Sequence, residues 1–297
     1  MPPSSFFLVS AVFHYLGPSF AVLLFARVDV LGVAWLRIAS AAAIFALWRR
    51  PWRVALRMST RERWLLLELG VVLAAMNSFF YLAVARLPLS TVGAIEFMGT
   101  VFVAALGAKT PRNAAALALT TLGVVTITSI RIAGAPVAFL FAFANGALFM
   151  LYVVLGHRMA NVATGSTAPG IEPVSSIDRL GASIIVAAVV VTPFGLGAAL
   201  PAVSRAELLI AGVAVGVCSS VIPYVTDQLA MSRMPRATFA LMLALLPMFA
   251  TIIGTIVLHQ LPTVLDLAGI ASVVAGIALH QIPQSGEPED RSDPWNR

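Results

Sequence analysis

The chain has 297 residues, 60% of them hydrophobic and only 11% charged, and its mean hydropathy is +0.94. Soluble domains usually carry about 25% charged residues, so this composition excludes an ordinary water-soluble enzyme or binding domain. The formal net charge is +6, and the single cysteine, Cys218, excludes an intrachain disulfide framework and a cysteine metal cluster.

The apolar residues occur in ten blocks of roughly 20 residues, the length of helix that crosses a bilayer core. We therefore predict an all-α membrane protein with ten transmembrane helices. In chain order the predicted spans are Ser5–Phe25, Val30–Trp48, Trp64–Val84, Ser90–Ala108, Ala114–Ile130, Pro136–Gly156, Ser176–Gly197, Leu208–Asp227, Ala237–Leu258 and Val264–Ile282. Residues 284–297 are polar, contain proline and are net acidic, which predicts a disordered cytoplasmic tail.

Positive residues are distributed unequally between the links that join these spans. With a cytoplasmic N-terminus, the inner links hold most of them, including six arginines between positions 49 and 63. The outer links hold only Arg27, Arg86, Arg131 and Arg205. Because cytoplasmic links are enriched in Lys and Arg, both termini are predicted to be cytoplasmic, in a cell (inner or plasma) membrane. A basic link between spans is typical of a topology signal beside anionic lipid, so we expect no nucleic-acid partner.

Part of the chain is repeated. Shifted by 147 positions, LAVARLPLSTVGAIEFMGTVFVAALG (82–107) aligns without gaps with LAMSRMPRATFALMLALLPMFATIIG (229–254), and seven positions are identical, including Arg86/Arg233 and Pro88/Pro235. The match pairs the third and fourth spans with the eighth and ninth, which divides the chain into two five-helix halves, 1–131 and 132–283. Because five is odd, the halves enter the membrane from opposite sides. Such inverted repeats are typical of secondary transporters with a site near the bilayer midplane.

These stretches resemble a known family. MNSFFYLAVARLPLSTVGAIEFMGTVFVAAL (76–106), SSVIPYVTDQLAMSRMPRATFALMLALLPMFATIIGTIVLHQLP (219–262) and the Leu36-Arg37 pair resemble the EamA-type drug/metabolite transporter superfamily, and within it the threonine/homoserine exporter branch. The resemblance covers all ten spans. It implies ten helices with both termini in the cytoplasm, and export of amino acids or related metabolites against a proton gradient.

The chain departs from that branch at two places. A Glu-Pro pair often follows the RxP turn of the ninth span there, and a Gly-Glu often precedes the tenth. This chain has Leu246-Pro247 and His259-Gln260 instead. Two acidic positions are therefore absent, which leaves Glu96 more isolated.

Glu96 is a carboxylate in the middle of the apolar fourth span. At about 100° per residue, Gly93, Gly99, Thr100 and Gly107 lie within about 60° of it, so this face of the helix is small and polar. Charged groups at membrane depth are costly, and we therefore predict that Glu96, with Thr100 beside it, binds a substrate ammonium group or the coupling proton. The alternative is a structural carboxylate that accepts a hydrogen bond where two helices approach closely.

Arg37 and His14 are two further candidates. Arg37 enters the second span about seven residues from its outer end, at a depth similar to that of Glu96. It is expected to pair with Glu96, to bind a substrate carboxylate, or to serve only as a structural arginine that caps backbone carbonyls. His14 is a candidate proton relay because histidine titrates near neutral pH, and a packing histidine beside the kink at Pro18 is the alternative.

Amides and aromatic residues on other helices suit the wall of a pocket for a polar substrate, and they suit interhelical hydrogen bonds equally well. These candidates are Asn77 and Tyr81 in the third span, Asn145 and Tyr152 in the sixth, and Tyr224 in the eighth. Pro223 and Pro247 break helices, so freed carbonyls either line a cavity or accompany a bend. Asp227, near the cytoplasmic end of the eighth span, is interpreted as an interfacial charge beside Arg233.

The sequence has no phosphate-binding loop, no HExxH or GxSxG motif and no acidic cluster with metal-ligand spacing. We therefore expect no enzyme activity, no ATP and no cofactor or metal. The prediction is a secondary transporter, a monomer or weak dimer in the lipid bilayer, that exports amino acids or related small polar metabolites by proton antiport. The alternatives are an uncoupled facilitator and an exporter of other metabolites or drugs.

Overall fold

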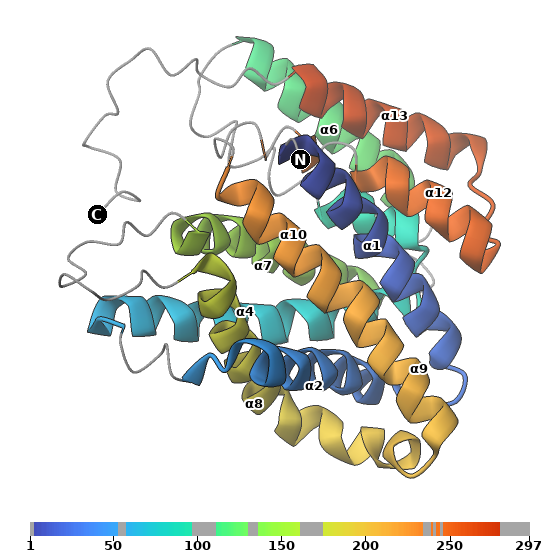
Figure 1. Cartoon of the computed structure of the whole chain (residues 1–297). Helices are drawn as coiled ribbons and strands as arrows, with labels where there is room; N and C mark the ends of the chain where they lie inside the picture. The colour runs from blue at the N-terminus through green and yellow to red at the C-terminus, as the bar shows by residue number, and fades with distance from the viewer. Residues whose placement is uncertain are drawn as a thin grey trace.

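The computed structural model describes residues 3–52, 58–96, 111–129, 136–160, 175–233 and 246–279, together with residues 239, 242 and 243 (Figure 1). Within these residues all regular structure is helical, and no strand is present. The predicted all-α class is therefore confirmed. Six of the described helices are long and apolar enough to cross a membrane, which agrees with the predicted multi-pass membrane protein.

Most helices coincide with predicted spans. The long apolar helices are α1 (Pro3–Leu24), α2 (Val30–Arg49), α4 (Thr60–Val84), α7 (Pro136–Ala160), α8 (Ser176–Val203) and the continuous run of α9 (Ala206–Gly216), the π-helical segment η2 (Val217–Val221) and α10 (Ile222–Met231). The other helices are α6 (Pro111–Ser129), α12 (Leu246–Leu258) and α13 (Val264–Leu279). Residues 89–96 are also helical. The rest of the predicted fourth span, and part of the ninth before residue 246, lie outside the described residues.

Local sequence signals explain where several helices begin. At the start of α4, the Ser59 hydroxyl accepts from the Glu62 backbone N–H, and the Glu62 carboxylate accepts from the Ser59 N–H (2.9 Å). Asp29 caps α2 by accepting from the Leu31 N–H at 2.9 Å. Such caps satisfy N–H groups that have no partner in the first turn of a helix.

Several helices, α8 and α10 among them, extend beyond the predicted ends of their spans. α8 continues past Gly197 to Val203, and α10 continues past Asp227 to Met231. In α8 the alanine and leucine residues after Gly197 favour helix, and a proline near the end of a helix removes a single backbone hydrogen bond.

The helices pack in pairs. α6 and α13 lie side by side at one edge of the molecule, and α2 packs along α8 at the opposite edge (Figure 1). Between these pairs, α4 contacts α7 and α8, while α1 contacts α10 and α12. The central helices α1, α4, α7 and α10 therefore surround the middle of the bundle.

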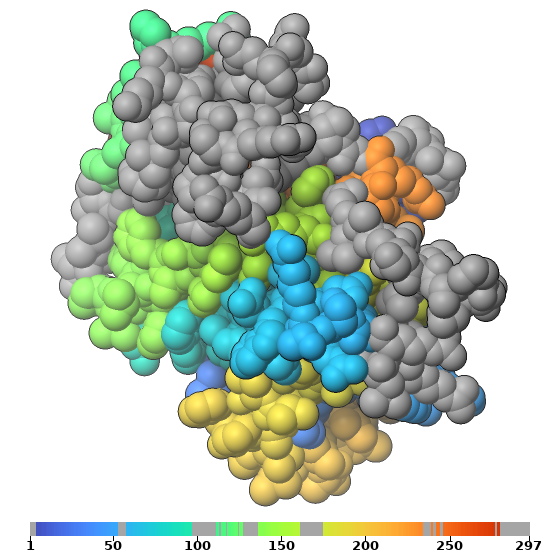
Figure 2. All heavy atoms as spheres, turned by 90° about the vertical axis from the view of Figure 1, so that its left-hand side faces the viewer, coloured from blue at the N-terminus to red at the C-terminus, as the bar shows by residue number. Residues whose placement is uncertain are grey.

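The two ends of this bundle can be distinguished by their ion pairs and by the links that they hold. At one end, Nε of Arg49 in α2 donates to Asp178 in α8 (2.6 Å), and Arg179 donates to Glu62 in α4 (3.3 Å). Figure 2 shows this end, where the start of α4 (light blue) lies between α7 (yellow-green) and α8 (yellow). The opposite end holds the short links from α1 to α2 and from α8 to α9. Consequently α4 and the α9–α10 run point in opposite directions.

Candidate binding site

The carboxylate of Glu96 points into the protein at the end of the helical residues 89–96, and its residue is only 2% exposed. Asn145 Nδ2 on α7 donates to Oε1 at 2.8 Å, and the Tyr15 hydroxyl on α1 donates to Oε2 at 3.3 Å. His14 Nε2 lies 4.0 Å from Oε2. Glu96 therefore meets polar groups from two other helices rather than lipid.

Arg37 lies on α2 and is 4% exposed. Its Nε donates to the Ser220 hydroxyl (2.8 Å), and its Nη2 donates to the Ser219 carbonyl (2.7 Å) and to the Tyr224 hydroxyl (3.4 Å). Its guanidinium carbon also lies 5.2 Å from the centroid of the Tyr81 ring. The guanidinium is therefore fixed between α4 and the π-helical segment of the α9–α10 run.

The predicted alternative of a pair between Arg37 and Glu96 is not what the structure contains. Neither side chain forms an ion pair with the other, although both line the same cavity. Within the described residues, Nη1 of Arg37 donates no hydrogen bond. One edge of the guanidinium consequently remains available to a ligand.

A proline explains why the Ser219 carbonyl can accept from Arg37. In an α-helix this carbonyl would pair with the N–H of residue 223, but Pro223 has no N–H. The chain is locally π-helical here, and π-helical turns occur frequently at functional sites. Gly17 on α1 allows the close approach, because an added Cβ would lie 2.6 Å from the Ser219 backbone nitrogen. The predicted freed carbonyl thus holds the arginine beside the cavity.

Asn77 and Tyr224 connect the two sides of the site. The Tyr224 hydroxyl on α10 lies 2.9 Å from Asn77 Nδ2 and 3.0 Å from Asn77 Oδ1, and both side chains are buried. Tyr224 thereby orients the amide of Asn77 on α4 and also accepts from Arg37. The amide and the guanidinium are held through one hydroxyl group.

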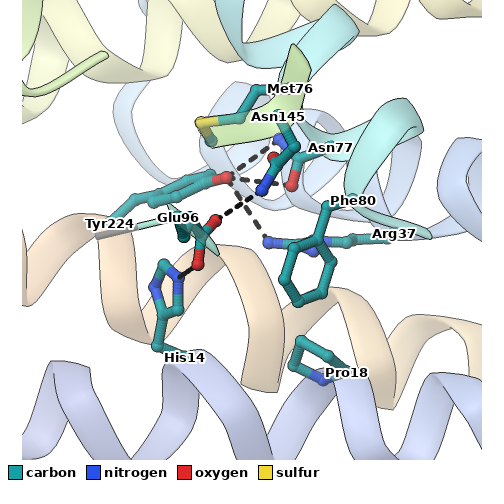
Figure 3. Close-up of a pocket in the computed structure, with 9 residues that line it drawn as sticks. All are labelled: His14, Pro18, Arg37, Met76, Asn77, Phe80, Glu96, Asn145 and Tyr224. Carbon is teal, nitrogen blue, oxygen red and sulfur yellow. Dashed lines mark hydrogen bonds and ion pairs between the residues drawn. The ribbon is translucent and has the colours of Figure 1, made fainter. Parts of the chain in front are cut away.

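These side chains line a small cavity with a free volume of about 10 Å³, room for about one water molecule (Figure 3). It brings together six residues predicted from the sequence, namely His14, Arg37, Asn77, Glu96, Asn145 and Tyr224. Pro18, Met76 and Phe80 complete the wall and were not among the predicted site residues. Drug-sized ligands usually occupy pockets of about 300–1,000 Å³, so the cavity is nearly closed in this conformation.

Two other predicted site residues, Tyr81 and Tyr152, lie beside the cavity rather than on its wall. Tyr81 packs its ring against Arg37, and its buried hydroxyl has no hydrogen-bond partner among the described residues. Tyr152 contacts the ring of Tyr224, with centroids 5.7 Å apart. Thr100 lies outside the described residues. Arg37 on α2, the second predicted span, lies on the cavity wall. No described residue of the ninth predicted span lies on that wall.

The interpretation of Asp227 as an interfacial charge was wrong. This residue is 5% exposed, and its Oδ2 accepts from the Tyr152 hydroxyl at 3.1 Å. Because α10 continues to Met231, Asp227 lies within the helix and faces the bundle, one turn beyond Tyr224. Its helical phase, shared with Tyr224, was the signal that could have identified it.

The arrangement places a buried anion and a buried cation on one small cavity together with neutral amide and hydroxyl groups. Such a set can bind both ends of a small zwitterion through charge-assisted hydrogen bonds. Among the described residues no group of three or more His, Cys, Asp or Glu side chains could hold a metal ion.

Comparison with known proteins agrees with the resemblance predicted from the sequence. Residues 145–280 match the EamA-like transporter family. The chain is 29% identical over 266 residues to the threonine/homoserine exporter RhtA of Salmonella typhimurium (strain LT2), and 28% identical over 266 residues to RhtA of Escherichia coli (strain K12). Each alignment covers 87% of this chain and 84% of the relative. A crystal structure titled only as that of a protein superposes with a TM-score of 0.60 at 19% identity, covering 93% of this chain and 96% of the other, which shows a shared fold.

Proposed function

We propose that this EamA-type membrane transporter, which resembles the threonine/homoserine exporter branch and is not an enzyme, exports small zwitterionic amino acids or closely related metabolites. One observation carries the proposal. Glu96 and Arg37 are both buried on one cavity, and each is held by its own neutral partners instead of by the other. Their opposite charges are therefore available to the two ends of one substrate.

The substrate orientation follows from these contacts. The α-ammonium group binds the Glu96 carboxylate, close to the hydroxyl of Tyr15 and the amide of Asn145. The α-carboxylate binds the Nη1 edge of Arg37, since Nε and Nη2 are engaged by the π-helical segment. Guanidinium–carboxylate bonds are among the stronger hydrogen bonds in proteins.

The ten-helix inverted repeat is part of this proposal, with halves 1–131 and 132–283. It is supported by Asn77 and Tyr224, which are separated by 147 positions, the shift of the sequence repeat, and are hydrogen-bonded to each other. A residue that touches its own counterpart lies on the axis that relates two halves. The cavity beside this pair would therefore lie at the interface of the repeats, where transporters of this architecture bind substrate.

Helix packing supports the same symmetry. The counterpart helices α2 and α8 pack together, and so do the counterparts α6 and α13. The contact of α1 with α10 has its equivalent in the contact of α7 with α4. The opposite directions of α4 and α9–α10 are those of two oppositely inserted halves.

The membrane orientation follows from charge. The end of the bundle that carries Arg49 and Arg179 adjoins the arginine-rich link between α2 and α4, and we assign it to the cytoplasm. Both termini then face the cytoplasm. The opposite end, where Arg27 lies 3.9 Å from Glu207, faces outward.

Coupling to protons completes the proposed mechanism. Glu96 binds the substrate ammonium group when the cavity is open to the cytoplasm, and it binds a proton after release to the outside. Because one carboxylate holds either cation, each proton that enters replaces one substrate that leaves. The gradient shifts the population between the two open states through this differential binding.

Transport in reconstituted vesicles tests the proposal. With an imposed proton gradient, unmodified protein should accumulate small amino acids, and Glu96→Gln, which can still accept from Asn145, should abolish gradient-driven uptake. Asp266→Asn is a matched control, because Asp266 is also buried (3% exposed) but accepts from Thr263 at the start of α13. Unchanged gradient-driven uptake by Glu96→Gln would contradict the mechanism, and equal uptake with and without a gradient would indicate an uncoupled facilitator.

A further inference from the structure

Asp227 is a second buried carboxylate, distinct from the wall of the Glu96 cavity. It receives a hydrogen bond from the Tyr152 hydroxyl on α7 at 3.1 Å. The Ser10 hydroxyl on α1 also lies beside this carboxylate, and it donates to the Pro223 carbonyl oxygen at 3.3 Å. Three helices, α1, α7 and α10, therefore converge on this carboxylate.

No described arginine, lysine or histidine forms an ion pair with Asp227. Arg233, on the same side of α10 in the sequence, stacks over the Phe6 ring at 4.8 Å. On α8, Arg179 donates to Glu62, and on α2, Arg37 donates to the π-helical segment. A buried carboxylate is costly unless its charge is balanced, and neutral hydroxyl groups do not balance it. A group in these surroundings is suited to bind a cation.

The position of the three residues follows from helical register. Ser10 precedes His14 by one turn of α1, Asp227 follows Tyr224 by one turn of α10, and Tyr152 lies two turns after Asn145 on α7. Each step leads toward the end of the bundle that carries the inner arginines. One turn rises about 5 Å, so these residues form a second polar layer on the cytoplasmic side of the cavity.

Aromatic rings separate the two layers. Tyr152 lies 5.7 Å from Tyr224 and 5.9 Å from Phe149, measured between ring centroids, and Phe149 in turn lies 5.8 Å from the His14 ring. Tyr224 and His14 belong to the cavity wall (Figure 3). Aromatic rings therefore lie between the two carboxylates, and no ion pair among the described residues bridges the two layers.

The second layer is asymmetric, and this asymmetry gives a direction. Under the repeat that relates Asn77 to Tyr224, the counterpart of Asp227 is Phe80, which lines the cavity toward the other side. The first half thus places an apolar ring where the second half places a carboxylate. A buried carboxylate therefore lies one turn from the cavity on the cytoplasmic side, and Phe80 provides no equivalent charge on the other side.

We propose that Asp227, with Tyr152 and Ser10, forms a second cation site on the cytoplasmic side of the cavity, which holds the substrate ammonium group before it reaches Glu96 or the proton after it leaves. The site rests on the proposed export function. It explains how an almost symmetric fold collects its cargo from one side.

Everted membrane vesicles, whose cytoplasmic face is outside, and right-side-out vesicles provide the test. If the site holds the ammonium group, Asp227→Asn should raise the half-saturation concentration of the amino acid about tenfold or more in everted vesicles and leave it nearly unchanged in right-side-out counterflow. If it holds the proton, the half-saturation concentration should stay constant and gradient-driven accumulation should be lost. Tyr152→Phe should cause a weaker effect of the same kind, and Asp227→Glu should restore part of it.

Asp266→Asn is again the control for loss of a buried carboxylate, and thermal unfolding in detergent verifies that each variant is folded. The cation site is overturned if folded Asp227→Asn and Tyr152→Phe match unmodified protein in half-saturation and in gradient dependence, while Glu96→Gln is inactive in the same vesicles. An absence of transport by unmodified protein would instead overturn the proposed function together with this site.

Discussion

Replacement of Arg37 by lysine removes the planar fork of donors but keeps the positive charge. The variant loses the bonds to Ser219 and Ser220 and the free Nη1 edge that we assign to the substrate carboxylate. Lysine offers a compact point charge on a flexible stem, which cannot reproduce the fixed direction of the Nη1 donors. The affinity for a carboxylate-bearing substrate should fall, although the charge of the cavity is unchanged.

The magnitude follows from the contacts at risk. A hydrogen bond to a charged group contributes about 1.5–3 kcal/mol, and a tenfold change in affinity corresponds to about 1.4 kcal/mol. Loss of the Nη1 contact should therefore weaken binding of an amino acid by about 10-fold to 150-fold. The corresponding decarboxylated amine makes no contact with Arg37, so its binding should change little.

Competition against a radiolabelled amino acid in purified protein measures both affinities. In unmodified protein the amino acid should bind more tightly than its amine, and this ratio should collapse in Arg37→Lys. Glu96→Gln should give the complementary pattern, with loss of discrimination between the amino acid and the hydroxy acid that lacks its ammonium group. An unchanged amino acid to amine ratio in Arg37→Lys would refute the assigned orientation.

Three further outcomes are expected. Gly17→Ala should lower the free energy of unfolding by about 1–3 kcal/mol, because its methyl group would meet the backbone of the π-helical segment. Gly197→Ala is the control and should cause no such loss, since nothing lies within 4 Å of the added Cβ. Thermal unfolding in detergent measures both variants. A double-mutant cycle of Arg49→Ala and Asp178→Ala should give a coupling energy of about 1 kcal/mol that decreases at high salt, because this ion pair is partly exposed. A coupling energy that does not change with salt would contradict this expectation. Tyr81→Phe should leave transport and stability unchanged, since its hydroxyl has no described partner, and a clear loss would assign that hydroxyl to the substrate.

The composition of the cavity could be predicted in large part from the sequence. A carboxylate and an arginine within apolar spans cost free energy, so both were singled out before their surroundings were known. Asn77, Asn145 and Tyr224 were identified because they lie on polar faces of otherwise apolar helices. Their convergence follows from tertiary packing, which no single helix specifies.

Other features required the structure. The lack of an Arg37–Glu96 pair depends on the π-helical segment, where Pro223 frees a carbonyl that holds the guanidinium. A sequence shows the proline but not which side chain uses the freed carbonyl. Asp227 was misplaced because the end of a membrane span is poorly defined by hydropathy, and a shift of one turn separates an interfacial from a buried position.

The opposite insertion of the two halves can be measured at Arg86 and Arg233, which correspond under the repeat and are both exposed. Single cysteines at these positions, in a Cys218→Ser background, can be labelled with a membrane-impermeant maleimide. An inverted repeat with cytoplasmic termini predicts labelling of position 86 in intact cells and of position 233 only after the membrane is permeabilised. Labelling of both positions from the same side would contradict it.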